Sequence, residues 1–222
     1  KWISVPDVAP GPGELKIRHT AVSVSYADLL HRSGQVALPL PAILGLGGVG
    51  VVEQVGENTA EFAVGDRVAY AMALGSYCQV RTLASALAVK LPDDVSDRSA
   101  AALFGRGLTA RYLVRDVLPL RAGDPILVYA AAGGVGSLVC QWAAALGATV
   151  IGVVSTRRKT DYARQCGCTH VIVASEENVV ARVVELTAGA KVAVVYDSIG
   201  KDTFLESLDC LRPRGLLVNY GR

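Results

Sequence analysis

A stretch of 32 residues, 125–156, contains no charged side chain. It opens with an apolar run, passes through the segment AAAGGVG (130–136) and an alanine-rich run, and ends after Gly147 in a β-branched run. About 20 apolar residues suffice to cross a membrane, but the paired glycines and Gly147 interrupt this stretch. A parallel strand covered on both faces is equally apolar. The stretch therefore predicts a strand, a tight turn, a helix and a second strand, with no membrane span.

The glycine-rich turn is suited to bind a phosphate. Glycine lets the chain turn sharply and lets a ligand approach the backbone, and a helix that starts near Gly134 directs unpaired N–H groups and its positive dipole end at an anion. The spacing Ala131-x-Gly133-x-x-Gly136 lacks the first glycine of the dinucleotide-binding pattern. The position between a strand and a helix favours that function over an ordinary glycine-rich turn. We expect pyrophosphate contacts from Ala132, Gly133, Gly134, Val135 and Gly136.

Strands and helices alternate from about residue 119 onward, which is typical of stacked βαβ units. Such connections are right-handed and give a parallel sheet with helices on both faces. We expect strands at 125–131, 149–155, 170–174, 192–198 and 215–220, with helices near 134–146, 158–166, 177–188 and 201–211.

Residues 1 to about 90 follow a different pattern. Short strand-like runs, starting at Glu14, Gly48, Asp66 and Tyr77, are broken by proline and glycine. They predict a compact, mostly antiparallel, barrel-like module. Residues 97–117 then predict a helical connection to the second region.

The composition limits the partners and the compartment. The formal net charge is +2, from 22 basic and 20 acidic residues, and no long basic run is present, so we expect no nucleic-acid partner. The residues before Asp7 contain no signal-peptide core. Five cysteines favour a reduced, cytoplasmic protein. The segment from Cys166 to His170 has the wrong spacing for a zinc site, and no second ligand pair exists, so we expect no metal.

Five segments resemble the medium-chain dehydrogenase/reductase superfamily, and within it the zinc-independent NADPH:quinone oxidoreductases related to zeta-crystallin. They are GPGELKIRHTAVSVSYADLLHRSG (11–34), VGDRVAY (64–70), KLPDDVSDRSAAALFGRGLTARYL (90–113), AAAGGVGSLVCQWAAALGATVIG (130–152) and VVYDSIGKDTFLESLDCLRPRGLLVNYG (194–221). The resemblance implies an α/β fold, with a GroES-like partly open β-barrel domain (1–117) followed by a Rossmann doubly wound parallel sheet (118–222). It also implies a sixth strand beyond Arg222 and a homodimer.

The segment after the second expected strand indicates which nicotinamide nucleotide binds. An NAD enzyme places Asp or Glu there to bind the ribose 2′-OH, whereas this chain has Ser155, Thr156, Arg157, Arg158 and Lys159. A hydroxyl and three cations suit a 2′-phosphate, although a solvated helix start is the alternative. The segment therefore predicts NADPH. By resemblance, Lys159 contacts the 2′-phosphate, Ala174 replaces a tyrosine that assists it, and Ser198, Tyr220 and Gly221 contact the cofactor.

The resemblance also implies the reaction, which is hydride transfer to a quinone or an α,β-unsaturated carbonyl without zinc. Zinc members carry Gly-His-Glu where this chain has Gly45, Leu46 and Gly47. Candidate catalytic residues are Ser25, Tyr26, Arg106 and Thr109, with Tyr26 equally suited to the core.

Several positions in the implied substrate cleft depart from the family. Ser25 stands for Asn, Leu30 for Tyr, Gly47 for Glu and Arg222 for Asn. These departures leave open an NADPH-binding protein with little turnover, acting as a sensor or in a structural role. An enoyl reductase of a polyketide-type pathway is a further alternative.

Overall fold

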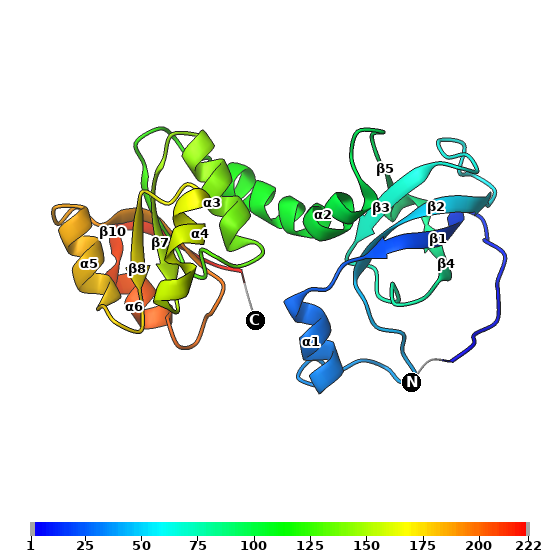
Figure 1. The fold of residues 1–222 in the computed structure, drawn as a ribbon, viewed down its shortest axis with the longest axis horizontal. Coiled ribbons are helices and arrows are strands. Elements are labelled where there is room, and N and C mark those ends of the chain that lie inside the picture. The colour runs from blue at the N-terminus through cyan, green and yellow to red at the C-terminus, as the bar shows by residue number, and fades with distance from the viewer. Residues whose placement is uncertain (1–2, 221–222) are drawn as a thin grey trace. The chain divides into compact units, whose positions relative to one another are not determined.

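The computed structural model describes residues 3–220 of the chain (Figure 1). The chain divides into two compact units, Lys1–Gly105 and Arg106–Arg222, and each unit is described by itself. Helix α2 (Asp97–Tyr112) contributes residues to both units. Within 3–220, no helix is long and apolar enough to cross a bilayer.

The first unit is built on a five-stranded antiparallel sheet in the order β4-β1-β2-β3-β5. Alternate residues of β1 and its partners bury Leu15, Ile17, Val52 and Val68 in one core, as a sheet with one packed face requires. The strands are β1 (Glu14–Val22), β2 (Gly47–Val55), β3 (Arg67–Ala71), β4 (Val80–Ala84) and β5 (Val89–Lys90), with helix α1 (Tyr26–Ser33) and the 3₁₀ turn η1 (Ser85–Leu87) between them.

The expected strand at Tyr77 starts three residues later than the sequence pattern indicates. The N–H of Tyr77 donates to the carbonyl of Leu44, and the N–H of Cys78 donates to the carbonyl of Ser76. These bonds hold residues 77–79 in a bend, so ladder pairing with β1 begins only at Val80.

A half-buried histidine on β1 links two neighbouring parts of the first unit by hydrogen bonds. The His19 ring lies 2.8 Å from the carbonyl oxygen of Cys78 through Nδ1 and 2.7 Å from the Tyr70 hydroxyl through Nε2. The Arg81 guanidinium sits 5.4 Å from the centre of the Tyr70 ring. Burial lowers the pKa of His19, the Cys78 carbonyl opposes part of that change, and the Arg81 charge adds to it. Tyr70 is fully buried and belongs to the core of this unit.

The second unit is a five-stranded, fully parallel sheet in the order β10-β9-β6-β7-β8. This confirms the doubly wound α/β fold. The strands are β6 (Pro125–Val128), β7 (Thr149–Val154), β8 (His170–Val173), β9 (Val192–Asp197) and β10 (Leu211–Asn219), and the helices are α3 (Gly136–Ala145), α4 (Thr160–Gln165), α5 (Val179–Leu186) and α6 (Phe204–Asp209), with a 3₁₀ turn η3 (Arg157–Lys159) before α4 and a π turn η2 (Leu113–Val117) after α2.

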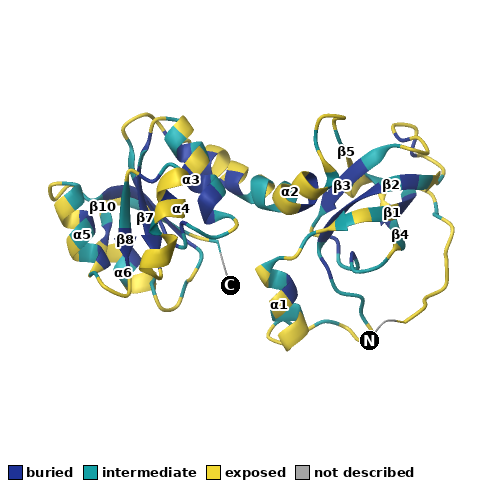
Figure 2. Ribbon diagram, viewed as in Figure 1, coloured by how far each residue is buried: buried dark blue, intermediate teal, exposed yellow. Residues whose placement is uncertain are grey.

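Two cores cover the two faces of the parallel sheet. Val139 and Ala143 of α3 and Ala163 of α4 pack on one face, and Val179 and Val183 of α5 pack on the other. Figure 2 shows β7, an inner strand of the sheet, as mostly buried and the outer faces of the helices as exposed. Strands β6, β7 and β9 are almost entirely inaccessible to solvent. The burial of β6 and β7 explains why the sequence carries no charge from residue 125 to residue 156.

The last expected helix and strand differ from the structure at their junction. Helix α6 ends at Asp209, and β10 begins at Leu211 rather than at residue 215. Leu211 pairs with Val192, and Arg214 then takes a left-handed conformation (φ 63°) where the register shifts. Cys210, expected inside the helix, is its C-cap residue and is fully buried.

Candidate functional site

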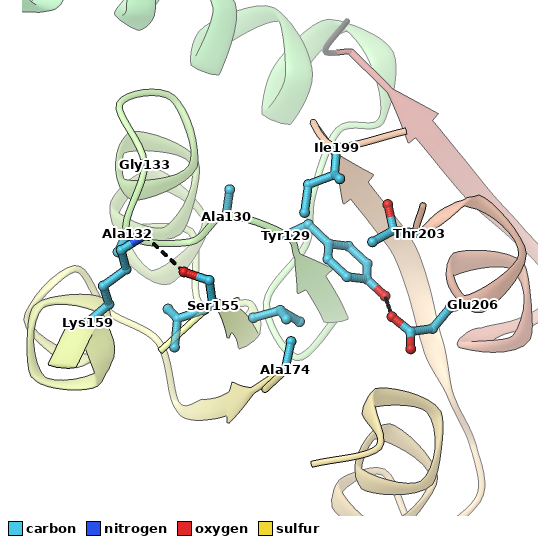
Figure 3. Close-up of a pocket in the computed structure, with 12 residues that line it drawn as sticks. Tyr129, Ala130, Ala132, Gly133, Ser155, Lys159, Ala174, Ile199, Thr203 and Glu206 are labelled. Carbon is cyan, nitrogen blue, oxygen red and sulfur yellow. Dashed lines mark hydrogen bonds between the residues drawn. The ribbon is translucent and has the colours of Figure 1, made fainter. Parts of the chain in front are cut away.

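A pocket with a cavity volume of about 200 Å³ lies in the second unit, at the ends of the parallel strands (Figure 3). It occupies the carboxyl end of β6, β7, β8 and β9, where ligands bind in open α/β sheets. Its lining consists of Tyr129, Ala130, Ala132, Gly133, Val153, Val154, Ser155, Lys159, Ala174, Ile199, Thr203 and Glu206.

The glycine-rich turn forms one wall. Ala130 adopts a left-handed conformation (φ 50°), and its carbonyl oxygen accepts a hydrogen bond from the N–H of Gly133 at 2.7 Å. A Cβ atom at Gly133 would lie 2.9 Å from that oxygen, and one at Gly136 would lie 2.3 Å from it. No side chain fits at Gly136 without displacing the turn, because real Cβ atoms do not approach so closely.

The turn presents unpaired hydrogen-bond donors. Helix α3 begins at Gly136 with no side-chain cap, and its Ser137 N–H is the first to reach a carbonyl, that of Gly133 at 3.0 Å. Within residues 3–220, the N–H groups of Gly134, Val135 and Gly136 have no backbone acceptor. Free N–H groups at a helix N-terminus form an anion-binding site.

Ala131 stands where the motif has its first glycine, and the neighbouring strand makes room for its methyl group. The Ala131 side chain is fully buried against the first face of the sheet. Position 152 on β7 is glycine, and a Cβ atom there would lie 2.9 Å from the Ala131 Cβ. Gly152 thus leaves the space that the methyl group of Ala131 occupies, so the turn keeps its shape with alanine at this position.

The basic segment contributes unequally to the pocket. Lys159 lines it and donates from Nζ to the Ser155 hydroxyl at 3.0 Å. Arg157 forms an ion pair with Glu176, a residue that the sequence analysis did not consider. Arg158 is exposed and does not line the pocket. Of the three expected cations, Lys159 alone belongs to the lining.

The pocket wall that faces Lys159 is formed by Tyr129 and Glu206, which the sequence did not indicate as site residues. The hydroxyl of Tyr129, directly after β6, donates to Glu206 Oε1 on α6 at 2.6 Å (Figure 3). Burial and the neighbouring Glu206 carboxylate raise the pKa of Tyr129. The position of Tyr129 at the end of a strand was a sequence signal for this wall. Glu206 had no such signal, because it lies 77 residues further along the chain.

A buried carboxylate orders the loop between β9 and α6. Asp197 is fully buried and accepts four hydrogen bonds. Its Oδ1 binds the N–H groups of Ile199 (2.8 Å) and Gly200 (3.1 Å), and its Oδ2 binds the hydroxyls of Thr203 (2.8 Å) and Ser207 (3.1 Å). This network fixes Ile199 and Thr203 as pocket walls.

The remaining expected cofactor contacts lie beyond β9 and β10. Ser198 follows β9, and Tyr220 follows β10. The Tyr220 N–H donates a hydrogen bond to the Asp197 carbonyl oxygen at 3.0 Å. Burial raises the pKa of Tyr220 to about 12, and the Ser198 hydroxyl opposes part of that change. Neither residue lines the pocket. Gly221, and the departure at Arg222, lie outside the described residues.

The four candidate catalytic residues divide between the units. Arg106 lies over the glycine turn, since a Cβ atom at Gly134 would be 2.8 Å from its Nε, and Thr109 follows on the same helix. Ser25 caps α1 in the first unit, and its N–H and hydroxyl both reach Asp28 Oδ2 at 2.7 Å. Tyr26 is 67 % exposed at the start of α1, so it does not take part in the core of its unit.

The cysteine-rich segment packs inside the second unit. Cys166 and Cys168 are buried in the same cluster as Cys140, and the pKa of the Cys140 thiol is raised by Cys168 and by burial. Among residues 3–220, no group of three or more His, Cys, Asp or Glu side chains is arranged to hold a metal ion.

Comparisons with known proteins assign the family. The alcohol dehydrogenase GroES-like domain matches residues 11–119, and the family described as zinc-binding dehydrogenase matches residues 134–222. The chain is 50% identical to a quinone oxidoreductase of Pseudomonas aeruginosa over 96% of this chain and 66% of that protein. It is 43% identical to a 2-haloacrylate reductase of a Burkholderia species over 99% and 68%. The chain belongs to the quinone oxidoreductase family of the medium-chain dehydrogenase/reductase superfamily.

Solved structures of the family agree with this fold. The Escherichia coli quinone oxidoreductase, crystallised with NADPH, superposes with a TM-score of 0.96 at 42% identity, covering 99% of this chain and 68% of that one. The chain spans about two thirds of the length of the curated relatives it matches.

Proposed function

We propose that the protein is an NADPH-dependent oxidoreductase that reduces a quinone or an α,β-unsaturated carbonyl without zinc. The pocket at the carboxyl end of β6–β9 is the observation that carries this proposal. It combines unpaired N–H donors at the start of α3 with a lysine and a hydroxyl after β7. The names of the relatives support the substrate class, because quinones and acrylates are both conjugated, electron-poor acceptors.

The residues present fit the nucleotide. The N–H groups of Gly134, Val135 and Gly136 can donate to a diphosphate, and the tight turn that presents them requires glycine at position 136, where a Cβ atom would lie 2.3 Å from the Ala130 carbonyl oxygen. Lys159 and Ser155 suit a ribose 2′-phosphate because a cation and a hydroxyl both donate to phosphate oxygens. No carboxylate stands at the end of β7 to prefer a ribose 2′-OH.

In this proposal NADPH supplies the hydride, and the chain positions the reactants. The amides of Gly134, Val135 and Gly136 would hold the diphosphate at the start of α3. Arg106 lies beside the turn, and together with Thr109, one turn further along α2, it would orient the nicotinamide end. Ser25 and Tyr26 contribute hydroxyls to the acceptor side. Holding the acceptor close to the cofactor supplies much of the rate increase.

The first experiment measures binding and turnover separately. NADPH fluorescence enhancement gives the affinity, and absorbance at the nicotinamide band gives oxidation across a panel of quinones, enones and acrylates. We expect NADPH to bind more tightly than NADH and to be oxidised by at least one member of the panel. Equal affinities for the two nucleotides would contradict the 2′-phosphate assignment.

A protein that binds NADPH with little turnover is the second candidate. Gly47 favours it, because the family carries Glu there, whereas here a Cβ atom would lie 3.0 Å from the Tyr70 carbonyl oxygen. Fluorescence enhancement without oxidation across the whole panel supports this candidate. Oxidation restricted to thioester-linked enoyl substrates supports an enoyl reductase instead. A homodimer and a cytoplasmic location complete the proposal.

A further inference from the structure

We propose that the Tyr129–Glu206 pair reads the exocyclic 6-amino group of the cofactor's adenine, and so makes the protein selective for adenine over 6-oxopurine nucleotides. The inference rests on the proposed function, because it assigns a role to residues of the same pocket. Neither residue belongs to the glycine turn or to the basic segment.

The pocket has the composition of a site for a planar base. Val153, Val154, Ala174 and Ile199 give it apolar walls, and Glu206 supplies a carboxylate at one side. An ordered water needs only roughly 10–15 Å³ of such space, so a volume of about 200 Å³ has room for an organic ring. The short side chain of Ala174 keeps this space open.

The carboxylate is held in one orientation. Tyr129 is 1 % exposed, and its hydroxyl reaches Glu206 Oε1 at 2.6 Å. Burial raises the pKa of Tyr129, so the phenol keeps its proton and donates it to the carboxylate. Oε1 is therefore committed to Tyr129. The second oxygen, Oε2, has no hydrogen bond within residues 3–220, and Figure 3 shows Glu206 beside the same pocket as Ala174.

A free carboxylate oxygen distinguishes the two purines by charge and hydrogen bonding. It only accepts hydrogen bonds, so it suits the 6-amino group of adenine, which donates. A 6-oxo group also accepts, and two acceptors facing each other leave both unpaired at a cost. Specific hydrogen-bonding sites reject an analogue that lacks the matching group more strongly than apolar sites do.

A purely structural role makes a different prediction. The same hydrogen bond fastens α6 to the end of β6, and if it did nothing else, any change at Glu206 would weaken all nucleotides equally. The ratio of two affinities in one protein therefore separates the two roles, whereas the affinity for NADPH alone does not.

The test compares NADPH with the reduced nicotinamide hypoxanthine dinucleotide phosphate, in which a 6-oxo group replaces the 6-amino group. Dissociation constants come from fluorescence titration or calorimetry, without any acceptor. We expect the protein to bind NADPH roughly tenfold more tightly, which is the effect of one charge-assisted hydrogen bond. Glu206→Gln places an amide, which can donate, at the same position, so the preference should fall to parity or reverse.

Two further variants complete the design. Tyr129→Phe frees the carboxylate to rotate and should reduce the preference to about threefold or less. Glu185→Gln removes a carboxylate from α5, away from the pocket, and should leave the preference unchanged. An equal affinity of the unmodified protein for both nucleotides, or a preference for hypoxanthine, overturns the inference while leaving NADPH binding intact. An unchanged preference in Glu206→Gln also overturns it. Absence of NADPH binding overturns the proposed function itself.

Discussion

Lys159 donates a hydrogen bond from Nζ to the Ser155 hydroxyl across 3.0 Å, so the cation and the hydroxyl at the end of β7 act as one unit. The 3₁₀ turn Arg157–Lys159 folds the chain so that Lys159 and Ser155, four residues apart, both line the pocket. Arg157 instead points its charge at Glu176. The basic segment therefore has one cation committed to the pocket and one committed to an ion pair.

This difference predicts that substituting Lys159 lowers the affinity for NADPH more than substituting Arg157 does. Lys159→Gln should weaken NADPH about tenfold, the effect of losing one charge-assisted hydrogen bond, and should change NADH affinity by less than about twofold. Arg157→Gln should have the smaller effect, because Arg157 already neutralises Glu176. Fluorescence titrations at low and high salt measure both. A larger loss for Arg157→Gln than for Lys159→Gln would show that the arginine leaves Glu176 to bind phosphate.

A side chain in the glycine turn should weaken both cofactor binding and stability. Gly136→Ala places a Cβ atom 2.3 Å from the Ala130 carbonyl oxygen, so the turn must open. We expect NADPH affinity to fall more than about tenfold and the free energy of unfolding to fall by about 1–3 kcal/mol. Titration and urea denaturation measure the two effects.

Gly107 in α2 is the matched control. A Cβ atom there has open space within 4 Å, and alanine is favoured over glycine in a helix by about 0.5–1 kcal/mol. Gly107→Ala should therefore raise the free energy of unfolding. If Gly136→Ala behaved like Gly107→Ala, the close approach at the turn would be refuted.

Arg67 on β3 holds the start of α2 through hydrogen bonds to Val95 and Asp97. Its guanidinium donates to Asp97 Oδ1 at 2.6 Å and to the carbonyl of Val95 at 2.5 Å. Arg67→Gln removes these charge-assisted bonds and should lower the free energy of unfolding by about 1–2 kcal/mol. Arg18→Gln breaks the exposed pair with Glu53 and should cost less than about 0.5 kcal/mol. Equal losses for the two variants in chemical denaturation contradict the assignment.

His19 predicts a loss of stability in mild acid. Burial lowers its pKa in the folded protein below the ordinary value of 6.5, so the unfolded chain takes up a proton first as the pH falls. The stabilising effect is fully present above 6.5 and decreases below it. Between about pH 7.5 and 5.5 the free energy of unfolding should fall by on the order of 1 kcal/mol.

His19→Gln should remove most of this pH dependence, because Gln does not titrate there. His170→Gln, on β8, serves as the control and should retain it. Urea denaturation of the three proteins at both pH values gives the comparison. A full pH dependence in His19→Gln would assign the effect to other groups.

The alternation of elements in the second unit could be predicted because its first two strands, β6 and β7, are buried on both faces and carry no charge. The place of Lys159 followed from the same logic, since the residues after the second strand reach the nucleotide's ribose in any such fold. The junction at Leu211 was not predictable locally, because strand pairing with Val192 overrides the helical pattern of the segment.

The far wall of the pocket was missed for a different reason. Tyr129, Thr203 and Glu206 come together only because β6 and β9 are neighbours in the sheet. The capping role of Ser25 did have a local signal, since Ser followed three residues later by an acidic residue marks a helix start. The resemblance suggests a catalytic role for the same residue, and that role stays a prediction beside the capping contact.

The Ala130 carbonyl oxygen has a consequence for how distant sequences are recognised. That one atom excludes a Cβ at both Gly133 and Gly136, whereas Ala131 keeps its methyl group through Gly152. A sequence search that requires all three glycines of the motif would reject this chain because of Ala131, the one motif position where the structure accommodates a methyl group. A screen that demands only the second and third, and then inspects position 152 for a small residue, would retain such chains and still discard accidental turns.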